Sequence, residues 1–437
     1  MNTIKDKILE LPQEWPGALH YGEEEVEAVT RVVRAQSPFR YYGIDFQHEV
    51  EKLEKELAAY IGVKYCLGVS HGTAALQVAL AAMGVGPGDE VLMPGYFWVS
   101  TVGAVVRSGA IPVLVDVDHS FNMDPEDMER KITSRSKVAI MVPMGGVMGQ
   151  IEKVAEICKK KNILLLEDNA QSCGASQFGK KAGSFGDMSI FSFQINKNIT
   201  AGEGGAVVTN SEDLYKKAFS IHDVGYIKDT EGNYDTENED YQYWGIGCRM
   251  SEITAAIVRV QLQKIDLITS SMRDFKHELI RIISPYKGIS SRHVADPAGD
   301  SGNFLKMTFD AKETAFKFRD GLMENGIKVR PGGYYPIHML DWGLHIYSNI
   351  PALVGKKSIC GHHSVWELQE NEFAKGYTYE KGTLPVLDSY VDRTVLFCIA
   401  SKLTDDQKAL IKQAFKDTCH QLLSNSNLSE FRFEISK

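Results

Sequence analysis

The sequence FSFQINKNITAGEGG, residues 191–205, decides the fold prediction. An apolar run (188–193) ends just before a single lysine, Lys197, and a glycine-rich turn then leads into a second apolar run (205–209). This pattern predicts one amine near the end of a buried strand, with glycines that let the backbone approach a bulky group closely. A lysine that closes a strand can simply be solvated. Burial of a free lysine amine, however, costs free energy unless the amine is bonded to another group. Lys197 is therefore a candidate for covalent attachment to a carbonyl group.

Similar apolar runs alternate with helix-like stretches through the first two thirds of the chain. The expected strands are 65–69, 90–93, 111–117, 138–142 and 163–166, and the expected helices include 23–34, 47–60, 73–83, 99–107 and 153–160. Strands that alternate with helices predict an α/β fold with a mostly parallel sheet and helices on both faces.

After about residue 272 the regular alternation of expected strands and helices ends, and the sequence predicts an α+β mixture. A helix over 252–267 is expected before this point, and a strand over 304–309 with helices over 313–325 and 405–422 after it. We therefore expect four parts: an N-terminal arm (1–21), a large domain (22–272), a smaller C-terminal domain (273–423) and a tail (424–437).

Composition excludes several classes of function. The 437 residues carry a net charge of -9 without a basic block, which argues against a nucleic-acid partner. No leader-like start and no apolar run long enough for a bilayer are present, so we expect a cytoplasmic protein with no membrane contact. Seven scattered cysteines without a CxxC pair favour free thiols over disulfides or zinc. The acidic loop 229–235 and the pair His362–His363 lack metal-ligand spacing, so no metal is expected.

Two further segments suit an anionic, aromatic cofactor. In Ser70-His71-Gly72-Thr73-Ala74-Ala75 a glycine turn and hydroxyls precede a helix, which suits a phosphate group or, alternatively, a simple helix cap. Residues 94–101, PGYFWVST, contain three consecutive aromatics, which serve either as core or as a platform for a flat ring.

Two acids end a very apolar strand in LLLEDNAQ, residues 164–171. Ligands of open α/β sheets bind outside such strand ends. Strand alternation points Glu167 and Asp168 to opposite sides, so only one can face a ligand, and the pattern leaves open which one does. Either could also cap the next helix. A lysine, a phosphate site, a carboxylate and an aromatic platform together fit pyridoxal 5′-phosphate held by Lys197 as a Schiff base.

These segments, in this order, resemble the DegT/StrS family of vitamin B6-dependent sugar aminotransferases, which have the fold type I of aspartate aminotransferase. The resemblance covers roughly residues 17–272 well and the remainder loosely. The matching stretches are 72–76, 88–91, 94–101, 167–172, 183–187, 191–198, 202–209 and 249–252.

The resemblance implies a role for each matching residue. Lys197 would be the Schiff-base lysine and general acid/base, and Asp168 would pair with the pyridine nitrogen. Trp98 would stack on the ring and Gln171 would contact the ring hydroxyl. The phosphate would be held by Gly72, Thr73 and Ser192.

The family also implies an activity and an assembly. An amino group would pass from L-glutamate or L-glutamine to a keto sugar, either a nucleotide-linked sugar or a keto-sugar acid of the octulosonate type, for amino-sugar biosynthesis. A homodimer with shared active sites is implied as well. Two alternatives are a sugar dehydratase, for which relatives carry histidine in place of the lysine, and a cofactor-binding regulatory protein without turnover.

Two positions depart from the family pattern. Gly247 stands where relatives carry an asparagine that reaches a phosphate in the neighbouring subunit, which puts that contact in doubt. Gln194 stands where many relatives carry histidine, which suggests a different substrate surface and makes Gln194 a candidate substrate residue.

Overall fold

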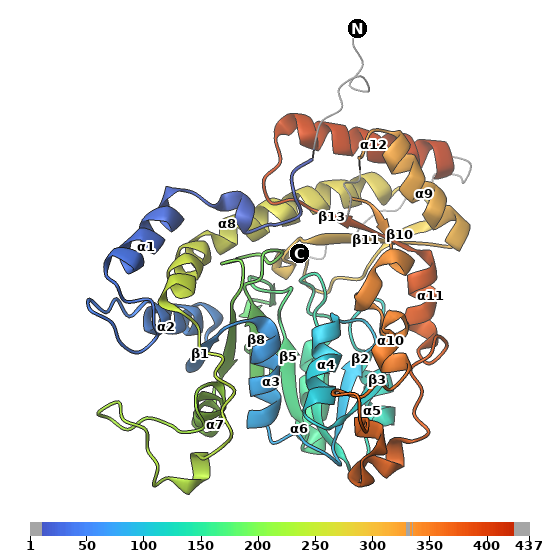
Figure 1. Cartoon of the computed structure of the whole chain (residues 1–437). Coiled ribbons are helices and arrows are strands. Elements are labelled where there is room, and N and C mark those ends of the chain that lie inside the picture. The colour runs from blue at the N-terminus through green and yellow to red at the C-terminus, as the bar shows by residue number, and fades with distance from the viewer. Residues whose placement is uncertain (1–10, 329–332, 334, 424–437) are drawn as a thin grey trace.

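The computed structural model describes residues 11–328, 333 and 335–423. It contains two principal β-sheets that are connected by one long helix, α8 (Glu252–Ile283), which runs from the large sheet to the small one (Figure 1). The predicted tail, 424–437, and the first ten residues of the predicted arm lie outside the described residues. Within the described residues no helix is both long and apolar enough to cross a membrane.

The large sheet has seven strands in the order β1-β9-β8-β5-β4-β2-β3. All neighbours from β8 to β3 pair in parallel, whereas β9 runs antiparallel to both β8 and β1. The strands are β1 (Tyr65–Val69), β2 (Glu90–Pro94), β3 (Ile111–Val115), β4 (Ser136–Met141), β5 (Leu164–Asp168), β8 (Met188–Ser192) and β9 (Gly205–Thr209). The predicted mostly parallel sheet is confirmed.

Helices cover both faces of this sheet because its strands are apolar on both sides. Leu166 faces a core that includes residues of α3, α4 and α7, whereas Leu165 faces a core built with α5 and α6. α2 and α8 pack over the β8–β9 end. The helices are α1 (Glu23–Arg34), α2 (Glu49–Ile61), α3 (Gly72–Ala82), α4 (Val99–Arg107), α5 (Pro125–Lys131), α6 (Ile151–Lys161) and α7 (Glu212–His222).

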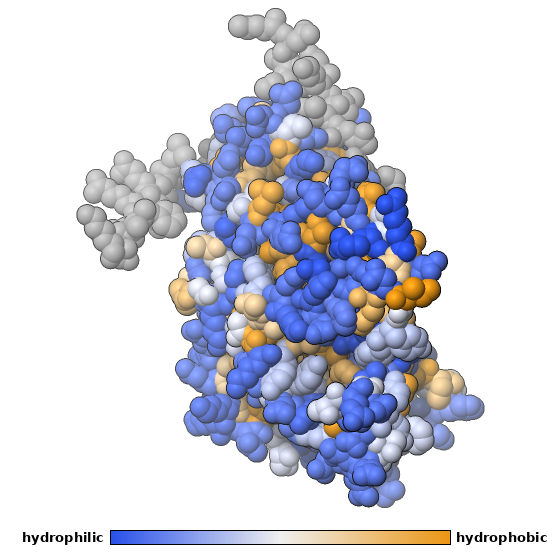
Figure 2. Space-filling model, turned by 90° about the vertical axis from the view of Figure 1, so that its left-hand side faces the viewer, coloured by the Kyte–Doolittle hydropathy of each residue, from blue (hydrophilic) through white to orange (hydrophobic). Residues whose placement is uncertain are grey.

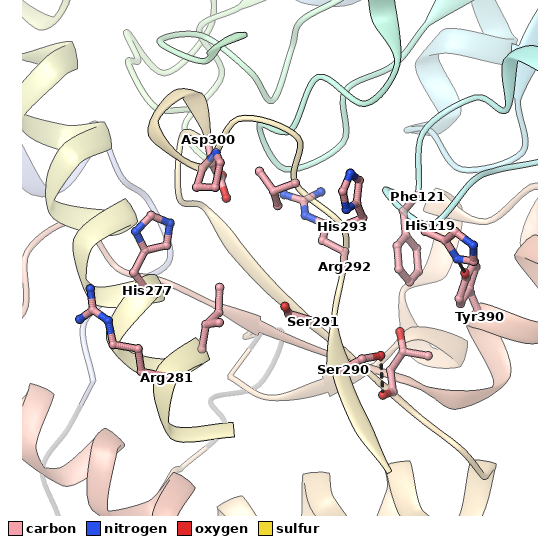
Figure 3. A pocket seen from close by; sticks show the side chains of 14 residues that line it. His119, Phe121, His277, Arg281, Ser290, Ser291, Arg292, His293, Asp300 and Tyr390 are labelled. Atoms are coloured by element: carbon pink, nitrogen blue, oxygen red, sulfur yellow. Dashed lines mark hydrogen bonds between the residues drawn. The ribbon is translucent and has the colours of Figure 1, made fainter. Parts of the chain in front are cut away.

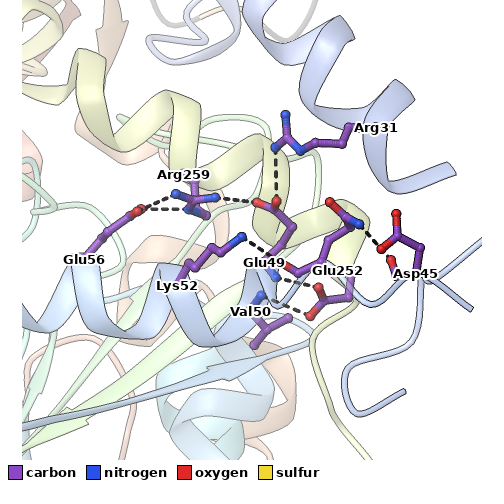
Figure 4. A network of polar contacts seen from close by, with 9 residues as sticks. Arg31, Asp45, Glu49, Val50, Lys52, Glu56, Glu252 and Arg259 are labelled. Carbon is purple, nitrogen blue, oxygen red and sulfur yellow. Dashed lines mark hydrogen bonds and ion pairs between the residues drawn. The ribbon is translucent and has the colours of Figure 1, made fainter. Parts of the chain in front are cut away.

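Helix α8 is much longer than the predicted 252–267. Ile268, Met272 and Phe275 continue the apolar stripe at helical spacing and are buried, which carries the helix on to Ile283. Its first residue fixes the start of α2 (Figure 4): the Glu252 carboxylate accepts the backbone N–H groups of Glu49 at 2.5 Å and Val50 at 3.1 Å. A carboxylate there complements the positive end of the α2 dipole.

The small sheet is antiparallel, in the order β10-β11-β13-β12, and packs against α9 and α12. Its strands are β10 (Ile289–Ser291), β11 (Phe304–Phe309), β12 (Ile337–His338) and β13 (Thr394–Cys398). The remaining elements are α9 (Lys312–Glu324), α10 (Pro351–Val354), α11 (Pro385–Arg393), α12 (Asp405–Leu423) and the short hairpin β6 (Ser176–Gln177) and β7 (Lys180–Lys181).

The segment between β12 and β13 returns to the large sheet. Tyr379 donates to the carbonyl of Pro112 at 2.9 Å, and the N–H of Val386 donates to Asp116 at 2.9 Å. The α+β character of the C-terminal part is confirmed. The domain limits 22–272 and 273–423 stay a prediction, and residue 272 lies inside α8.

Candidate active site

A cavity of about 430 Å³ lies where β1, β2, β5 and β8 end. This is the edge at which open α/β sheets bind ligands. The structure brings together the eight candidate site residues, and they line this one cavity. They are Gly72, Thr73, Trp98, Asp168, Gln171, Ser192, Gln194 and Lys197. Gly247, which departs from the family pattern, is not among its lining residues.

One end of the cavity is a cradle of hydrogen-bond donors at the N-terminus of α3. Gly72 and Thr73 are the first residues of this helix, so their N–H groups have no acceptor within it. A Cβ on Gly72 would lie 2.7 Å from Cβ of Ser192, and a Cβ on Gly205 would lie 2.7 Å from the backbone of His71. Only glycines therefore allow Ser192 and β9 to approach the helix end so closely. The cradle combines N–H groups, hydroxyls and the positive end of a helix dipole, which suits a phosphate.

The two acids at the end of β5 point in opposite directions, as strand alternation predicts. The Glu167 carboxylate is buried and accepts the N–H groups of Gly183, Phe185 and Gly186 at 2.7–2.8 Å. Its role is to fix that turn, away from the cavity.

Asp168 faces the cavity, where Thr101 Oγ1 donates to Oδ2 at 2.7 Å and the N–H of Ala170 donates to Oδ1 at 3.2 Å. Burial raises the pKa of Asp168, while these two hydrogen bonds and the charge of Lys197 oppose the rise. Asp168 is thus the acid of the pair that lies where a ligand ring nitrogen can reach it.

Lys197 lies in the hairpin loop between β8 and β9. The turn is closed by hydrogen bonds from Lys197 N to the carbonyl of Gln194 (2.9 Å) and from Ala201 N to the carbonyl of Phe193 (3.0 Å). Burial lowers the pKa of the Lys197 amine, although Asp168 and Glu203 act in the opposite sense. A lowered pKa increases the fraction of unprotonated amine, which is the nucleophilic form.

The N-terminal segment 11–21 is attached to this lysine loop. The N–H of Gly17 donates to the carbonyl of Lys197 at 3.2 Å, and Tyr21 Oη donates to the carbonyl of Thr200 at 3.0 Å. Ser401 Oγ donates to the carbonyl of Pro16 at 2.8 Å, which ties the segment to the C-terminal part as well. As a result Glu14 forms part of the cavity wall.

Trp98 and Gln171 also line the cavity. Trp98 precedes α4 and is 41% exposed, which makes its indole available for stacking. Gln171 Oε1 accepts the N–H of Gly145 at 3.2 Å. Because the oxygen is used by the backbone, the NH₂ group of Gln171 is the part that remains for a ligand.

Sequence reasoning missed several residues that line the cavity. Ser100 and Thr101 lie inside the aromatic segment that the sequence singled out, and Thr73 Oγ1 donates to Ser100 Oγ at 3.0 Å. The others come from segments that match the family loosely or not at all and had no local signal: Glu14, Asn303, Phe304, Trp342 and His345.

The residues present fit pyridoxal phosphate. The N–H and hydroxyl donors of the cradle suit a phosphate, the Asp168 carboxylate suits a protonated ring nitrogen, and the Lys197 amine suits an aldehyde carbon. The NH₂ group of Gln171 matches a ring oxygen.

A second cavity, of about 560 Å³, lies between α8, β10 and the loop after β3 (Figure 3). His119, His277 and His293 line it with Arg281 and Arg292, and none of the predicted site residues does. In the described part of the chain no group of three or more His, Cys, Asp or Glu side chains could hold a metal. All eight candidate site residues line the other cavity, the one that contains Lys197.

Comparison with known proteins identifies a family. The model of the DegT/DnrJ/EryC1/StrS aminotransferase family matches residues 20–348. The GDP-perosamine synthase of Caulobacter vibrioides is 33% identical over 314 residues, which are 68% of this chain and 79% of the relative. The L-glutamine:2-deoxy-scyllo-inosose aminotransferase of Streptoalloteichus tenebrarius is 31% identical over 307 residues, which are 69% and 71% of the two chains. The crystal structure of 3-amino-5-hydroxybenzoic acid synthase superposes with a TM-score of 0.74 at 25% identity, covering 95% of this chain and 100% of that one.

Fold and site together define an enzyme of the pyridoxal-phosphate-dependent class with a type I fold. The chain belongs to the DegT/DnrJ/EryC1/StrS family of sugar aminotransferases, as the resemblance in its sequence implied.

Proposed function

We propose that this protein transfers the amino group of L-glutamate or L-glutamine to a keto sugar, either nucleotide-linked or a keto-sugar acid of the octulosonate type, for amino-sugar biosynthesis. The observation that carries the proposal is the convergence of Lys197, Asp168 and the phosphate cradle on one cavity. The name of the inosose aminotransferase specifies L-glutamine as donor, and that of the perosamine synthase specifies a nucleotide-linked amino sugar.

Each residue has a distinct task in this proposal. Pyridoxal phosphate, when bound, supplies a conjugated ring that accepts the electron pair released at the substrate carbon. Gly72, Thr73 and Ser192 would bind its phosphate, Trp98 would cover its ring and Asp168 would keep the ring nitrogen protonated. Lys197 Nζ would hold the aldehyde carbon in the resting enzyme and, as general acid/base, would move the proton at the reacting substrate carbon. Gln194, whose Oε1 accepts the N–H of Asn196 at 3.0 Å, contributes to the substrate surface.

The attachment of the cofactor is tested directly by borohydride reduction followed by peptide mapping. We expect the pyridoxyl group on the peptide with Lys197, and no label in Lys197→Ala. Label on another lysine would contradict the assignment.

The reaction scheme is tested by steady-state kinetics. A donor that leaves its amino group on the enzyme before the acceptor binds gives parallel lines when both substrates are varied, whereas intersecting lines would exclude this scheme. Keto sugars with and without a nucleotide then identify the acceptor. A cofactor that no amino acid converts would favour the regulatory alternative, and release of water from the sugar without amination would favour the dehydratase.

We further propose that two chains associate with shared active sites. Three exposed apolar side chains support this: Trp244 is 96% exposed, Ile44 81% and Tyr42 72%. Figure 2 views the side of α1, α2 and α7, where apolar patches interrupt the polar surface. Among the described residues that line the cavity, Lys197 is the only lysine or arginine, which leaves room for a cationic group from a second chain beside the phosphate.

Light scattering of Trp244→Ser with Ile44→Ser tests this assembly. We expect the native chain to have the mass of a dimer and the variant that of a monomer. A monomeric native chain would contradict the proposal.

A further inference from the structure

The peptide bond between Met144 and Gly145 connects the small sheet to the cavity that contains Lys197. It lies in the loop after β4, and because it is trans, its carbonyl and its N–H point in opposite directions. On one side the N–H of Gly145 donates to Gln171 Oε1 at 3.2 Å. On the other side the carbonyl oxygen of Met144 accepts two side-chain donors. One peptide unit therefore stands between these donors and a side chain that lines the cavity.

The two donors are buried basic residues from the small sheet. Arg292 directly follows β10 (Figure 3) and Lys306 lies in β11, and the two residues are 4% and 1% exposed. Arg292 Nη1 donates to the carbonyl of Met144 at 2.7 Å, and Lys306 Nζ donates to the same oxygen at 3.0 Å. Arg292 Nη2 also donates to the carbonyl of Gly145 at 2.5 Å. Three side-chain hydrogen bonds thus hold two consecutive carbonyls.

The loop 143–146 is held against these donors from both sides. The N–H of Ser301 donates to the carbonyl of Gly146 at 3.1 Å, and a Cβ on Gly146 would overlap Ser301 Oγ. On the opposite side Ser172 Oγ donates to the carbonyl of Pro143 at 2.6 Å. The loop is therefore packed between the residues that precede β11 and those that follow β5.

The bound peptide sets the orientation of the Gln171 side chain. A donor at a peptide oxygen polarises the whole peptide unit, so its N–H becomes a better donor. Here that N–H occupies Gln171 Oε1, and the NH₂ group is consequently the end of the amide that is left for a ligand. Without this hydrogen bond the two ends of the amide, which have similar size, can exchange places, and the cavity would then present an acceptor.

Lys306 is a donor whether or not its amine is charged. Burial lowers the pKa of Lys306 well below its usual range, and the charges of Arg292 and Lys276 act in the same sense, whereas Asp300 opposes them. Both the ammonium and the neutral amine have N–H bonds, so deprotonation does not remove the hydrogen bond to Met144. Arg292 stays protonated. Both donors therefore persist across the neutral pH range.

We propose that Arg292 and Lys306 are positioning residues for the cofactor. Through the peptide that both side chains hold, they keep the NH₂ group of Gln171 in the orientation that binds the ring oxygen of pyridoxal phosphate. This inference rests on the cofactor site of the proposed function and deepens it, because it names what makes that site selective for a hydroxylated ring. An amide turned the other way would place an acceptor against this oxygen.

Two ligands without an aldehyde test the inference on the apoenzyme. Pyridoxine 5′-phosphate keeps the ring oxygen but cannot become attached to Lys197, and 3-deoxypyridoxine 5′-phosphate lacks that oxygen. Their dissociation constants are measured by fluorescence titration, and the ratio of the two is the preference for the hydroxyl group. We expect the native apoenzyme to prefer pyridoxine 5′-phosphate by about tenfold, and Gln171→Leu to lose most of this preference.

Variants of the two donors separate positioning from a structural role. Lys306→Met has a side chain of similar length without an N–H, and we expect its preference to fall to about threefold, as in Arg292→Met. Lys306→Gln and Arg292→Lys retain a donor and should restore part of the preference. Lys131→Met is the matched control, because Lys131 also donates to a backbone carbonyl, that of Leu114 at 2.8 Å, but does not line this cavity. It should keep the native preference.

A double variant tests whether the effect passes through Gln171. In the Gln171→Leu background, Lys306→Met should leave the preference unchanged, because no amide remains to be oriented. A further fall in the preference would show that Lys306 acts on the ring oxygen by another route, and would overturn the inference.

The remaining outcomes distinguish this inference from the proposed function. An undiminished preference in both Lys306→Met and Arg292→Met, even with weaker binding of both ligands, would assign the two residues a purely structural role and overturn the inference. Equal affinities of the native apoenzyme for the two ligands, or an undiminished preference in Gln171→Leu, would overturn it as well. Failure of the native apoenzyme to bind either ligand would contradict the cofactor site and hence the proposed function. If Arg292→Met did not fold, Lys306→Met and the double variant would still decide the question.

Discussion

Thr101 Oγ1 donates a hydrogen bond of 2.7 Å to Asp168 Oδ2, and both side chains are buried. The hydroxyl thereby orients the one carboxylate that faces the cavity. It also opposes the effect of burial on the pKa of that carboxylate. Thr101 is thus a positioning residue that lies only three residues after Trp98 in the sequence.

Thr101→Val is expected to weaken cofactor binding by about tenfold to a hundredfold, the usual effect of a hydrogen bond to a charged group. Without the hydroxyl the pKa of Asp168 rises further, so the protonated form persists to higher pH. The loss of affinity for pyridoxal phosphate should therefore be larger at pH 6 than at pH 8. Equilibrium binding to the apoenzyme across this range measures it. Thr101→Ser should restore the native profile, and a loss independent of pH would argue against the electrostatic role.

Gly72→Ala is expected to lower the affinity for pyridoxal phosphate by at least about tenfold. The new Cβ would lie 2.7 Å from Cβ of Ser192, so the helix end and Ser192 must separate and the phosphate cradle opens. Gly103→Ala in α4 is the control, because nothing lies within 4 Å of its Cβ position. That variant should bind the cofactor normally and gain roughly 0.5–1 kcal/mol in unfolding free energy. Unchanged cofactor affinity in Gly72→Ala would refute the cradle.

Asp300→Asn is expected to cost about 3–5 kcal/mol of unfolding free energy, measured by denaturant titration. Asp300 forms a fully buried ion pair with Lys276, and Lys276 and Arg292 hold the pKa of Asp300 below its usual range against the effect of burial. Removal of the carboxylate charge leaves Lys276 buried without a counter-charge. The double variant Lys276→Met with Asp300→Asn should recover much of the loss. A single variant as stable as the native protein would indicate that water reaches the pair.

Acid is expected to destabilise the fold through buried neutral histidines. Burial lowers the pKa of His222 to about 3, whereas the unfolded residue titrates near 6.5. Between these values only the unfolded chain binds the proton, so stability falls as the pH falls, by up to about 1.4 kcal/mol per pH unit. His338 and His345, with pKa values lowered to about 4, act in the same sense. Unfolding free energies at pH 7, 6 and 5 should show this slope, and His222→Gln should reduce it. An identical slope in both proteins would contradict the assignment.

The sequence predicted the elements that have a local signature. The strands 65–69 and 304–309 and the helices 23–34 and 99–107 have the predicted bounds, because period and burial agree there. The end of α8 was predicted too early, since the polar run at 269–271 interrupts a stripe that resumes at Met272.

The candidate site was predictable where its residues follow a strand end. Strand alternation left the choice between Glu167 and Asp168 open, and the family resemblance implied Asp168. In the structure Glu167 turns to the loop 183–186, whereas Asp168 lines the cavity. Glu14 and His345 could not be predicted, because no local pattern places an N-terminal segment or a 3₁₀ turn against a strand end of another part of the chain.

The attachment of the first described residues to both the lysine loop and Ser401 has a consequence for biosynthesis. During translation the lysine loop is synthesised about 180 codons after the N-terminal segment, whereas Ser401 follows almost four hundred codons after Pro16, so the second docking partner is missing for much longer. The contact that ties this segment to the C-terminal part therefore forms only after Ser401 has been synthesised, and a product terminated before Ser401 lacks that anchor for the cavity wall at Glu14.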